Sequence, residues 1–238
     1  MKKSSLFQFG IGIFSVLASA HALAQQPSYL GIAGVQGSSE AAYAFTGVIV
    51  PFSGAKVGEG PYYKAIASWL RYRYDTTQGG QTVGIRARAP GIEGGVGYAW
   101  TGENYGFDVS ATIGYRDISV RPFAPPGERS GNVFTLNPQV QARYAFTPAI
   151  DTDLISNYSF GQDTSFNRIR LGWKPEATWR TGVEGIWQRG ENYRVQQQGL
   201  FAAKQLANGV SVEISGGRAE ARDGSTSAYG GLGVAKMF

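Results

Sequence analysis

Arginine is the residue type in this chain whose spacing points most directly to chemistry. Nine arginines fall at polar positions of alternating runs, and they are Arg71, Arg73, Arg86, Arg88, Arg116, Arg143, Arg168, Arg170 and Arg180. Acidic residues occupy positions of the same kind at Asp75, Asp108, Glu184 and Glu213. A guanidinium group binds a carboxylate or a phosphate through paired hydrogen bonds. The arginines could therefore pair with these acids or bind a polar ligand.

Histidine and cysteine chemistry is almost absent. The chain has one histidine, His21, and no cysteine, and His21 falls in a predicted export signal. Most transition-metal sites, histidine general bases and Ser-His-Asp triads need one of these residues. We therefore expect no enzyme, no catalytic residues, no metal site and no cofactor. Asp151 and Asp153 share one strand face beside a turn and are interpreted as solvated charge, with a cation site as the alternative.

The first 24 residues have the pattern of a secretory signal peptide. Lys2 and Lys3 form the charged start, Phe7–Leu17 is the apolar middle, and Ala22 to Ala24 form a small-x-small cleavage site. The apolar run is too short for a membrane helix, which needs about 20 residues. The sequence thus predicts a cleaved signal at 1–24 and one mature domain at 25–238.

The mature chain alternates between apolar and polar residues. In 134–146, Phe134, Leu136 and Tyr144 share one strand face, and Thr135 and Gln141 lie on the other. Similar runs predict about twelve strands, at 29–37, 41–50, 63–75, 83–100, 107–120, 134–146, 151–160, 165–173, 179–188, 193–204, 210–219 and 227–238. Pro90 and Gly91 predict a bulge or bend within the fourth run.

These runs predict an all-β fold, an antiparallel transmembrane β-barrel in the outer membrane of a Gram-negative cell. Glycine and aromatic residues are abundant and charged residues make up only 16%, as expected for barrel strands with an aromatic girdle. An even strand number, with short turns alternating with longer loops, would leave both termini in the periplasm. The segment 51–61 is an exception, because it should be a short turn and is long.

In such a barrel the polar face must point into the lumen, because lipid cannot form hydrogen bonds with charged side chains. Two interpretations of the nine arginines stay open. They could fill the interior with arginine–carboxylate pairs, or they could line a surface that meets a polar ligand such as a sugar or an anion. A barrel of about 8 strands is filled by side chains, and one of 16–18 strands leaves a channel. A count of about twelve strands therefore does not decide between the two interpretations.

Several short strings, in this order and spacing, resemble one family over most of the mature chain. They are Tyr72 to Asp75, Ala87 to Glu93, Gly97-Tyr98, Tyr115 to Asp117, Ser159 to Asp163, Gly199 to Phe201 and Thr226 to Gly231. The family is the bacterial cellulose biosynthesis protein BcsS family. The resemblance implies an exported accessory protein of cellulose production or secretion, and it supplies no catalytic residues.

The expected function is therefore a non-enzymatic outer-membrane barrel that assists cellulose biosynthesis and secretion. Its expected partners are outer-membrane lipid, with cellulose or other cellulose-secretion components as candidates. The mild formal charge of +5, without any Lys/Arg-rich run, argues against nucleic acid. The alternative is a small general porin or ligand-binding barrel unrelated to cellulose. A barrel hydrolase or acyltransferase is disfavoured by the missing histidine.

Overall fold

The computed structural model describes residues 29–125, 128–190, 194–221 and 224–238. The predicted signal peptide at 1–24 lies outside these residues. Within them, no helix has the length and apolar character needed to cross a membrane.

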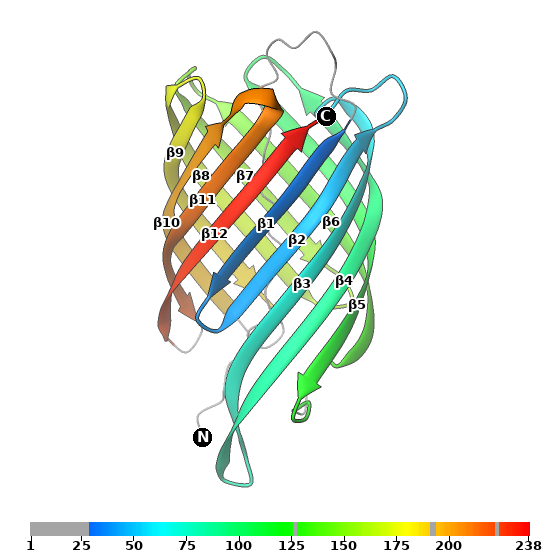
Figure 1. Cartoon of the computed structure of the whole chain (residues 1–238), viewed down its shortest axis with the longest axis vertical. Helices are drawn as coiled ribbons and strands as arrows, with labels where there is room; N and C mark the ends of the chain where they lie inside the picture. The colour runs from blue at the N-terminus through cyan, green and yellow to red at the C-terminus, as the bar shows by residue number, and fades with distance from the viewer. Residues whose placement is uncertain (1–28, 126–127, 191–193, 222–223) are drawn as a thin grey trace.

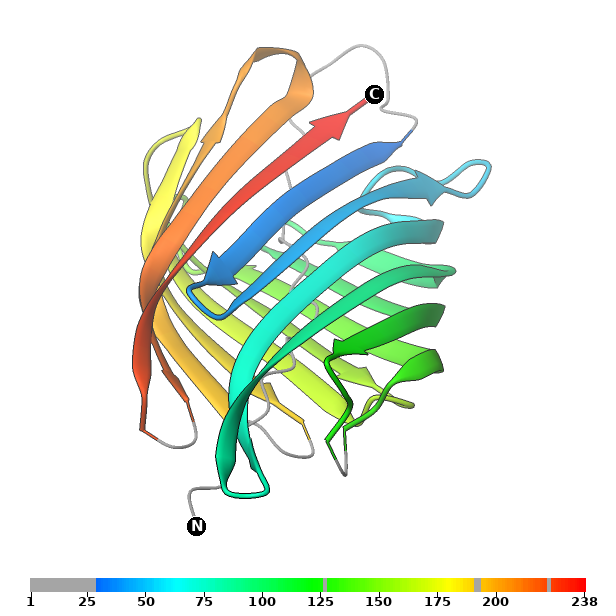
Figure 2. The ribbon, with the colours of Figure 1, turned by 60° about the horizontal axis from the view of Figure 1, so that its bottom comes forward.

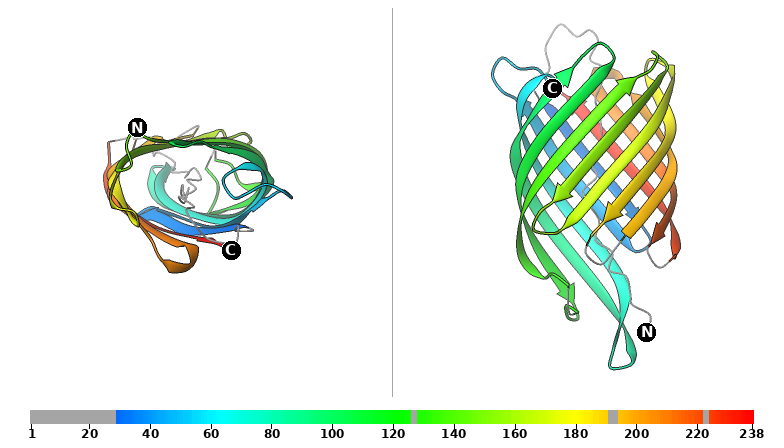
Figure 3. Two further views of the ribbon diagram at one scale, coloured as in Figure 1. Left: turned by 90° about the horizontal axis from the view of Figure 1, so that it is seen from above. Right: turned by 180° about the vertical axis from the view of Figure 1, so that it is seen from behind.

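Twelve antiparallel strands form a closed barrel, in which each strand pairs with its sequence neighbours and β12 returns to β1 (Figures 1 and 3). The strands are β1 (Leu30–Ser38), β2 (Ala41–Pro51), β3 (Gly60–Gln78), β4 (Gln81–Thr101), β5 (Tyr105–Arg121), β6 (Gly131–Ala145), β7 (Ile150–Ser159), β8 (Thr164–Glu176), β9 (Trp179–Arg189), β10 (Arg194–Gln205), β11 (Val210–Ala221) and β12 (Thr226–Met237). The predicted fold and all twelve predicted strands are confirmed, with boundaries shifted by a few residues.

The barrel closes where the first described residue meets the last. The Tyr29 amide donates to the Phe238 carbonyl at 3.4 Å, the Phe238 amide donates to the Tyr29 carbonyl at 3.0 Å, and their rings stack at 4.5 Å. Both ends of the barrel chain therefore lie at one rim, which we call the terminal end. The opposite rim, which carries the turns that follow β1, β3, β5, β7, β9 and β11, is the hairpin end.

One hairpin extends beyond the rest of the wall at the hairpin end. β3 and β4 pair without a register shift from Gly60 opposite Ala99 to Gln78 opposite Gln81. They project past the other strands (Figures 1 and 2). At the terminal end, the long segment between β2 and β3 is a real excursion, because Lys56 and Glu59 bridge each other within it.

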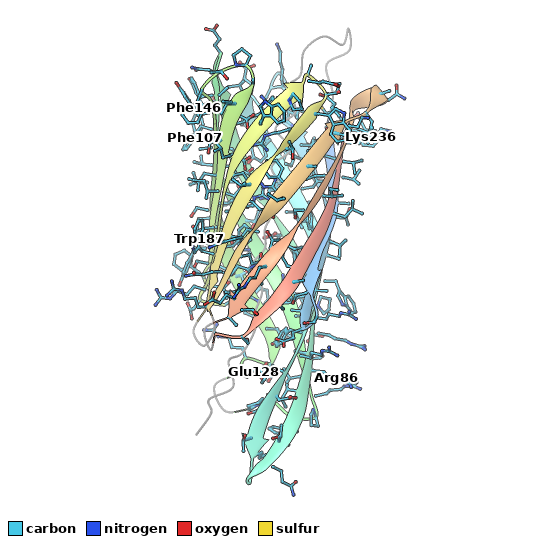
Figure 4. All side chains as sticks on the ribbon, turned by 90° about the vertical axis from the view of Figure 1, so that its left-hand side faces the viewer. Arg86, Phe107, Glu128, Phe146, Trp187 and Lys236 are labelled. Atoms are coloured by element: carbon cyan, nitrogen blue, oxygen red, sulfur yellow. The ribbon has the colours of Figure 1, made fainter. Side chains whose placement is uncertain are left out.

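Apolar side chains cover the outer surface of the wall. Phe134 is 71% exposed and Ile113 is 70% exposed, far more than a core residue would be. Aromatic residues concentrate toward the two rims, with Phe107 and Phe146 toward the terminal end and Trp187 toward the hairpin end (Figure 4). This belt between two aromatic girdles is the surface that a transmembrane barrel presents to lipid. The predicted lipid face of 134–146 is confirmed.

The face assignment is reversed on β3. The predicted lumen orientation of Arg71 and Arg73 would put the alternate residues of β3 on the lipid face, but Ile66, Leu70, Tyr72 and Tyr74 are all buried inside the wall. They belong to an apolar cluster on the interior side of β1 to β5 and β12. The lumen of this barrel is thus partly apolar, so hydrophobicity alone does not identify the lipid face.

The expected bulge at Pro90 is not observed. Pro90 lies opposite Trp69 in the ladder with β3, and the register with β5 is the same before and after it, with Arg88 opposite Ser119 and Gly91 opposite Arg116. Proline cannot donate a ladder hydrogen bond, and its side chain faces outward here. The register shift that is observed lies between Trp173 and Glu176, at the β8–β9 turn.

Candidate functional site

The structure divides the nine predicted arginines into two groups. Five have inward side chains, and they are Arg116, Arg143, Arg168, Arg170 and Arg180. Four point outward from the β3–β4 hairpin, and they are Arg71, Arg73, Arg86 and Arg88. The predicted lumen orientation is wrong for these four and also for Asp75, because the inward positions between them are taken by Tyr72 and Tyr74 on β3 and by Ala87 on β4. Figure 4 shows Arg86 projecting away from the hairpin.

Arg170 is one of two centres of ion pairing inside the barrel. This interior ion network consists of Arg143, Asp151, Asp153, Arg168, Arg170, Lys174, Arg180, Glu184 and Glu213. The Arg170 guanidinium donates to Glu184 Oε2 at 2.8 Å and to both oxygens of Glu213 at 2.8 Å. Tyr229 donates its hydroxyl proton to the other oxygen of Glu184 at 2.9 Å. Arg170 is thereby paired on two sides while only 1% exposed.

An aromatic ring supports the two neighbouring guanidinium groups. The ring of Phe201 on β10 lies 4.4 Å from the Arg170 guanidinium carbon and 4.8 Å from that of Arg180. The negative face of an aromatic ring attracts a cation, and the attraction grows when the pair is removed from water. Phe201 therefore helps to position both guanidinium groups against the inner side of β10.

Asp151 is a second centre, nearer the terminal end. Its side chain is fully buried, and it accepts from Arg143 at 2.6 Å and Arg180 at 2.7 Å and pairs with Lys174 at 2.9 Å. Arg180 also donates to Asp153 at 2.5 Å. The interpretation of Asp151 and Asp153 as solvated charge is therefore wrong, because each carboxylate is buried among cations.

Gly172 makes room for this second centre. A Cβ atom at position 172 would lie 2.6 Å from both Arg180 Nε and Asp151 Oδ1. Atoms at that separation overlap, so a side chain here would force the pair apart. Glycine on β8 is thus the residue that permits the close approach of Arg180 to Asp151.

Arg168 and Arg116 complete the set of inward arginines. Arg168 Nη2 lies 3.9 Å from Asp153 Oδ1, a longer separation than in the other ion pairs of the network. Arg116 Nη1 donates to the Ala89 carbonyl at 2.9 Å, and Arg116 Nη2 donates to Ser68 Oγ at 3.1 Å. These contacts anchor Arg116 to β3 and β4, away from the interior ion network.

A neutral hydrogen-bond cluster surrounds Glu93 on β4. Glu93 Oε2 accepts from Thr112 at 2.7 Å and from Asn137 at 2.9 Å, and Asn137 Oδ1 accepts from Ser159 at 2.6 Å. Asp108 similarly accepts from the Tyr62 hydroxyl at 2.6 Å. Polar side chains of β3 to β7 therefore bind one another across the interior, as buried polar groups must.

The β5–β6 segment reaches back to the projecting hairpin. Glu128 accepts from the Tyr72 hydroxyl at 2.9 Å and also from the Tyr74 hydroxyl. Burial raises the pKa of the Glu128 carboxyl above its usual range, and the Tyr72 hydrogen bond opposes this rise. Arg129 pairs with Asp163 of the β7–β8 turn at 2.6 Å. Two hairpin-end loops are thus tied to each other and to β3.

The charged side chains inside the barrel hold one another in fixed positions through ion pairs. Each guanidinium of the Arg170 and Asp151 centres contacts carboxylates of this same chain, which is the geometry of a structural network. Across the described ranges, no group of three or more His, Asp or Glu side chains is arranged to hold a metal ion. The exposed fraction rises toward the terminal end, where the side chains of Arg143, Lys174 and Arg180 are 15–20% exposed.

Four contributors to the network were missed from the sequence. Lys174, Phe201, Tyr229 and Gly172 take part in it, but only Lys174 carries a charge that could have signalled this. Lys174 stands at the same strand parity as Arg168 and Arg170, so the alternation could have found it. Phe201 and Tyr229 depend on which side chains meet inside the closed barrel, and Gly172 depends on the β7–β8 register, which sets it opposite Asp151.

A family model described as cellulose biosynthesis protein BcsS matches residues 32–238, which is nearly the whole described barrel. The chain belongs to the BcsS family. The resemblance seen in the short strings is therefore confirmed. The BcsS match begins two residues inside β1 and runs to the end of the chain, so it covers all twelve strands.

Solved structures share the fold of this BcsS family member at low sequence identity. The COG4313 outer membrane channel from Pseudomonas putida F1 has a TM-score of 0.55 at 9% identity, with 94% of this chain and 100% of that chain covered. The KdgM porin has a TM-score of 0.53 at 10% identity, with 88% and 99% covered. The transport unit of the autotransporter AIDA-I from Escherichia coli has a TM-score of 0.53 at 13% identity, with 94% of each chain covered. These likenesses concern the fold alone. A search of curated proteins gives no match.

Proposed function

We propose that this protein is a non-enzymatic outer-membrane barrel that assists the secretion of bacterial cellulose. The observation that carries the proposal is the BcsS family match over residues 32–238, which coincides with a complete transmembrane barrel. The matched region is the barrel itself, so the protein would act at a membrane that strands can cross. The outer membrane is that membrane, because closed barrels with aromatic girdles span it.

The positions of the chain ends and of the long hairpin support an orientation of the barrel in the outer membrane. Both ends of the barrel chain meet at the terminal end, and the longest projection, the β3–β4 hairpin, lies at the hairpin end. In outer-membrane barrels the turns face the periplasm and the longer excursions face outside. We place the terminal end in the periplasm, where a cellulose-secretion apparatus would meet Arg143, Lys174 and Arg180 at the rim of the interior.

A role without catalysis is supported by how the polar side chains are used. The carboxylates of the Arg170 and Asp151 centres contact arginine or lysine, which leaves them poorly suited to act as acid or base. Residues 25–238 contain no histidine or cysteine that could serve as an alternative. The candidate actions are therefore to form a path, to anchor the secreted polymer, or to hold a partner.

The test is a chromosomal deletion in a cellulose-producing host, complemented with the wild-type protein. We expect surface cellulose, measured by dye binding and by glucose released with cellulase, to fall in the deletion strain and to return on complementation. Synthase activity of isolated inner membranes should stay the same, because the barrel acts after polymerisation. Unchanged surface cellulose in the deletion strain would overturn the proposal.

A small porin or ligand-binding barrel is the second candidate, and the partly exposed cations at the terminal end favour it. Arg143, Lys174 and Arg180 would attract anions or hydrogen-bond the hydroxyl groups of a saccharide there. Recording in planar bilayers separates the two candidates. A general porin gives steady open-channel conductance without cellulose components, whereas a dedicated accessory barrel, including one that forms a path only together with those components, gives none on its own.

A further inference from the structure

The outward face of the projecting hairpin and its neighbour carries an unusual group of arginines. This outer arginine patch consists of Arg71 and Arg73 on β3, Arg86 and Arg88 on β4, and Arg121 on β5. All five side chains are exposed, and they point away from the barrel interior. None of them belongs to the interior ion network.

The strand register sets these like charges directly against one another. Arg71 lies opposite Arg88, Arg73 lies opposite Arg86, and Arg86 in turn lies opposite Arg121. Directly opposed side chains on one sheet face have Cβ atoms about 4.5–5.5 Å apart, and like charges at that spacing repel. The patch is therefore unfavourable unless an anion lies between the guanidinium groups.

The described part of this chain does not provide that anion. The acidic residues nearest in register are Glu40, opposite Arg73, Asp75 on β3 and Asp117 on β5, and none of them forms an ion pair with the patch. The contrast with the interior is sharp, because all but one of the inward arginines are paired with a carboxylate. The partner of the outer arginine patch must come from its surroundings.

Its surroundings are set by the neighbouring lipid-facing residues. Trp69 and Pro90 lie opposite each other and are the outward residues next to Arg71 and Arg88 on the side toward the membrane belt, and Trp69 is 48% exposed. Two residues of strand span about 7 Å, so the first arginine pair stands just beyond the aromatic girdle, at the level of lipid headgroups. Arg73 and Arg86 follow two residues farther out.

We propose that the outer arginine patch binds the phosphate groups of lipid A, the phosphorylated lipid anchor of lipopolysaccharide in the outer leaflet. Phosphate matches the planar guanidinium fork, and one phosphate can accept from two opposed arginines at once. The site goes beyond the proposed role in cellulose secretion and rests only on the outer-membrane placement of the hairpin end. It would fix the height and tilt of the projecting hairpin against the membrane surface.

The test uses the full-length mature barrel, refolded in detergent, with a fluorescent lipid A that carries both phosphates as the probe. The triple variant Arg71→Gln/Arg86→Gln/Arg88→Gln should bind this probe about tenfold or more weakly than wild type, since each arginine contributes to anionic lipid binding. The matched control Lys56→Gln/Lys204→Gln/Lys236→Gln removes three outward or turn charges at the terminal end and should bind as wild type does. Heat-modifiable gel migration confirms that each variant is folded.

A second measurement keeps the proposal testable without any variant. Wild-type protein should bind lipid A whose phosphates have been removed as weakly as the arginine triple variant binds the intact lipid. Millimolar inorganic phosphate should compete only slightly, because the acyl chains hold the lipid against the belt. Equal affinity for intact and dephosphorylated lipid A, or equal affinity of wild type and triple variant, would overturn the assignment. Full competition by inorganic phosphate would overturn the lipid as its source. All these readouts are independent of cellulose.

Discussion

Arg170 on β8 donates to both carboxylate oxygens of Glu213 on β11, at 2.8 Å each, although two strands stand between them in the wall. The bond therefore crosses the interior of the barrel. With the Tyr229 bond to Glu184, which joins β12 to β9, it links strands that are not neighbours in the wall. The network thus acts as an internal brace for this part of the barrel.

Removing one side of this brace should destabilise the barrel strongly. Glu213→Gln leaves the buried Arg170 with one carboxylate, and we expect the free energy of unfolding to fall by about 3 kcal/mol. Urea unfolding from lipid vesicles measures it. Glu176→Gln, at the exposed end of β8, is the matched control and should change little. The triple variant Arg170→Met/Glu184→Gln/Glu213→Gln should be less destabilised than Glu213→Gln alone, because it removes the buried cation together with both of its carboxylate partners. Equal stability of Glu213→Gln and Glu176→Gln would contradict the brace.

Gly172→Ala should open the Asp151 centre. The added methyl group would lie 2.6 Å from both Arg180 Nε and Asp151 Oδ1, so the ion pair must separate or the strand must shift. We expect a loss of about 1–3 kcal/mol in the free energy of unfolding, typical of an overpacked site. Gly94→Ala on β4 is the control, since its nearest neighbour would lie at 3.9 Å. A Gly172→Ala barrel as stable as the Gly94→Ala barrel would show that the pair tolerates displacement.

The assignment of lipid and lumen faces predicts the cost of a charge on the belt. Ile113 is 70% exposed between the two girdles, so Ile113→Arg should cost about 2–4 kcal/mol of folding free energy in a bilayer. Leu206→Arg, in the β10–β11 turn, should cost about 0–1 kcal/mol because it lies at the interface. Unfolding from vesicles measures both changes. A cheaper substitution at Ile113 than at Leu206 would mean that the belt does not face lipid.

The contact between Glu128 and the two tyrosines should depend on pH. Burial raises the folded pKa of Glu128, so the docked loop is fully stabilised below the ordinary glutamate pKa and loses this contribution as pH rises through the raised value. Hydrogen exchange of the peptide around Glu128 should therefore be slower at about pH 4 than at about pH 8, after correction for the intrinsic rate. Glu128→Gln should abolish this difference, and Glu103→Gln at the opposite rim should preserve it. Protection that increases with pH in the wild type would refute the assignment.

Much of the fold could be predicted from the sequence because the two faces of a barrel strand have different surroundings, lipid on one side and the barrel interior on the other. On β6, lipid selects Phe134, Leu136 and Tyr144 for one face, and the interior selects Thr135 and Gln139 for the other. The resulting alternation is visible without coordinates. The same rule was wrong for β3, because the interior there is itself apolar and the outward positions past Trp69 have left the lipid.

The candidate site could be predicted only in its residue types. Arg170 and Glu184 were identified as inward charges, but pairing Arg170 with Glu213 requires knowing which strands face each other across a closed barrel. Phe201 looked like any other apolar strand residue and proved to face inward against two arginines. The odd or even position of a residue on its strand determines whether its side chain points inward or outward. Which other inward side chain it contacts is determined only when the barrel closes.

The most direct test of the central claim is to measure where newly made glucan accumulates when the barrel is missing. Radiolabelled glucose is followed into cellulase-sensitive polymer at the cell surface and in the periplasm, in deletion cells carrying either the wild-type gene or an empty vector. We expect cells without the barrel to lose polymer at the surface while inner-membrane synthesis continues. The same surface yield with and without the barrel would contradict it.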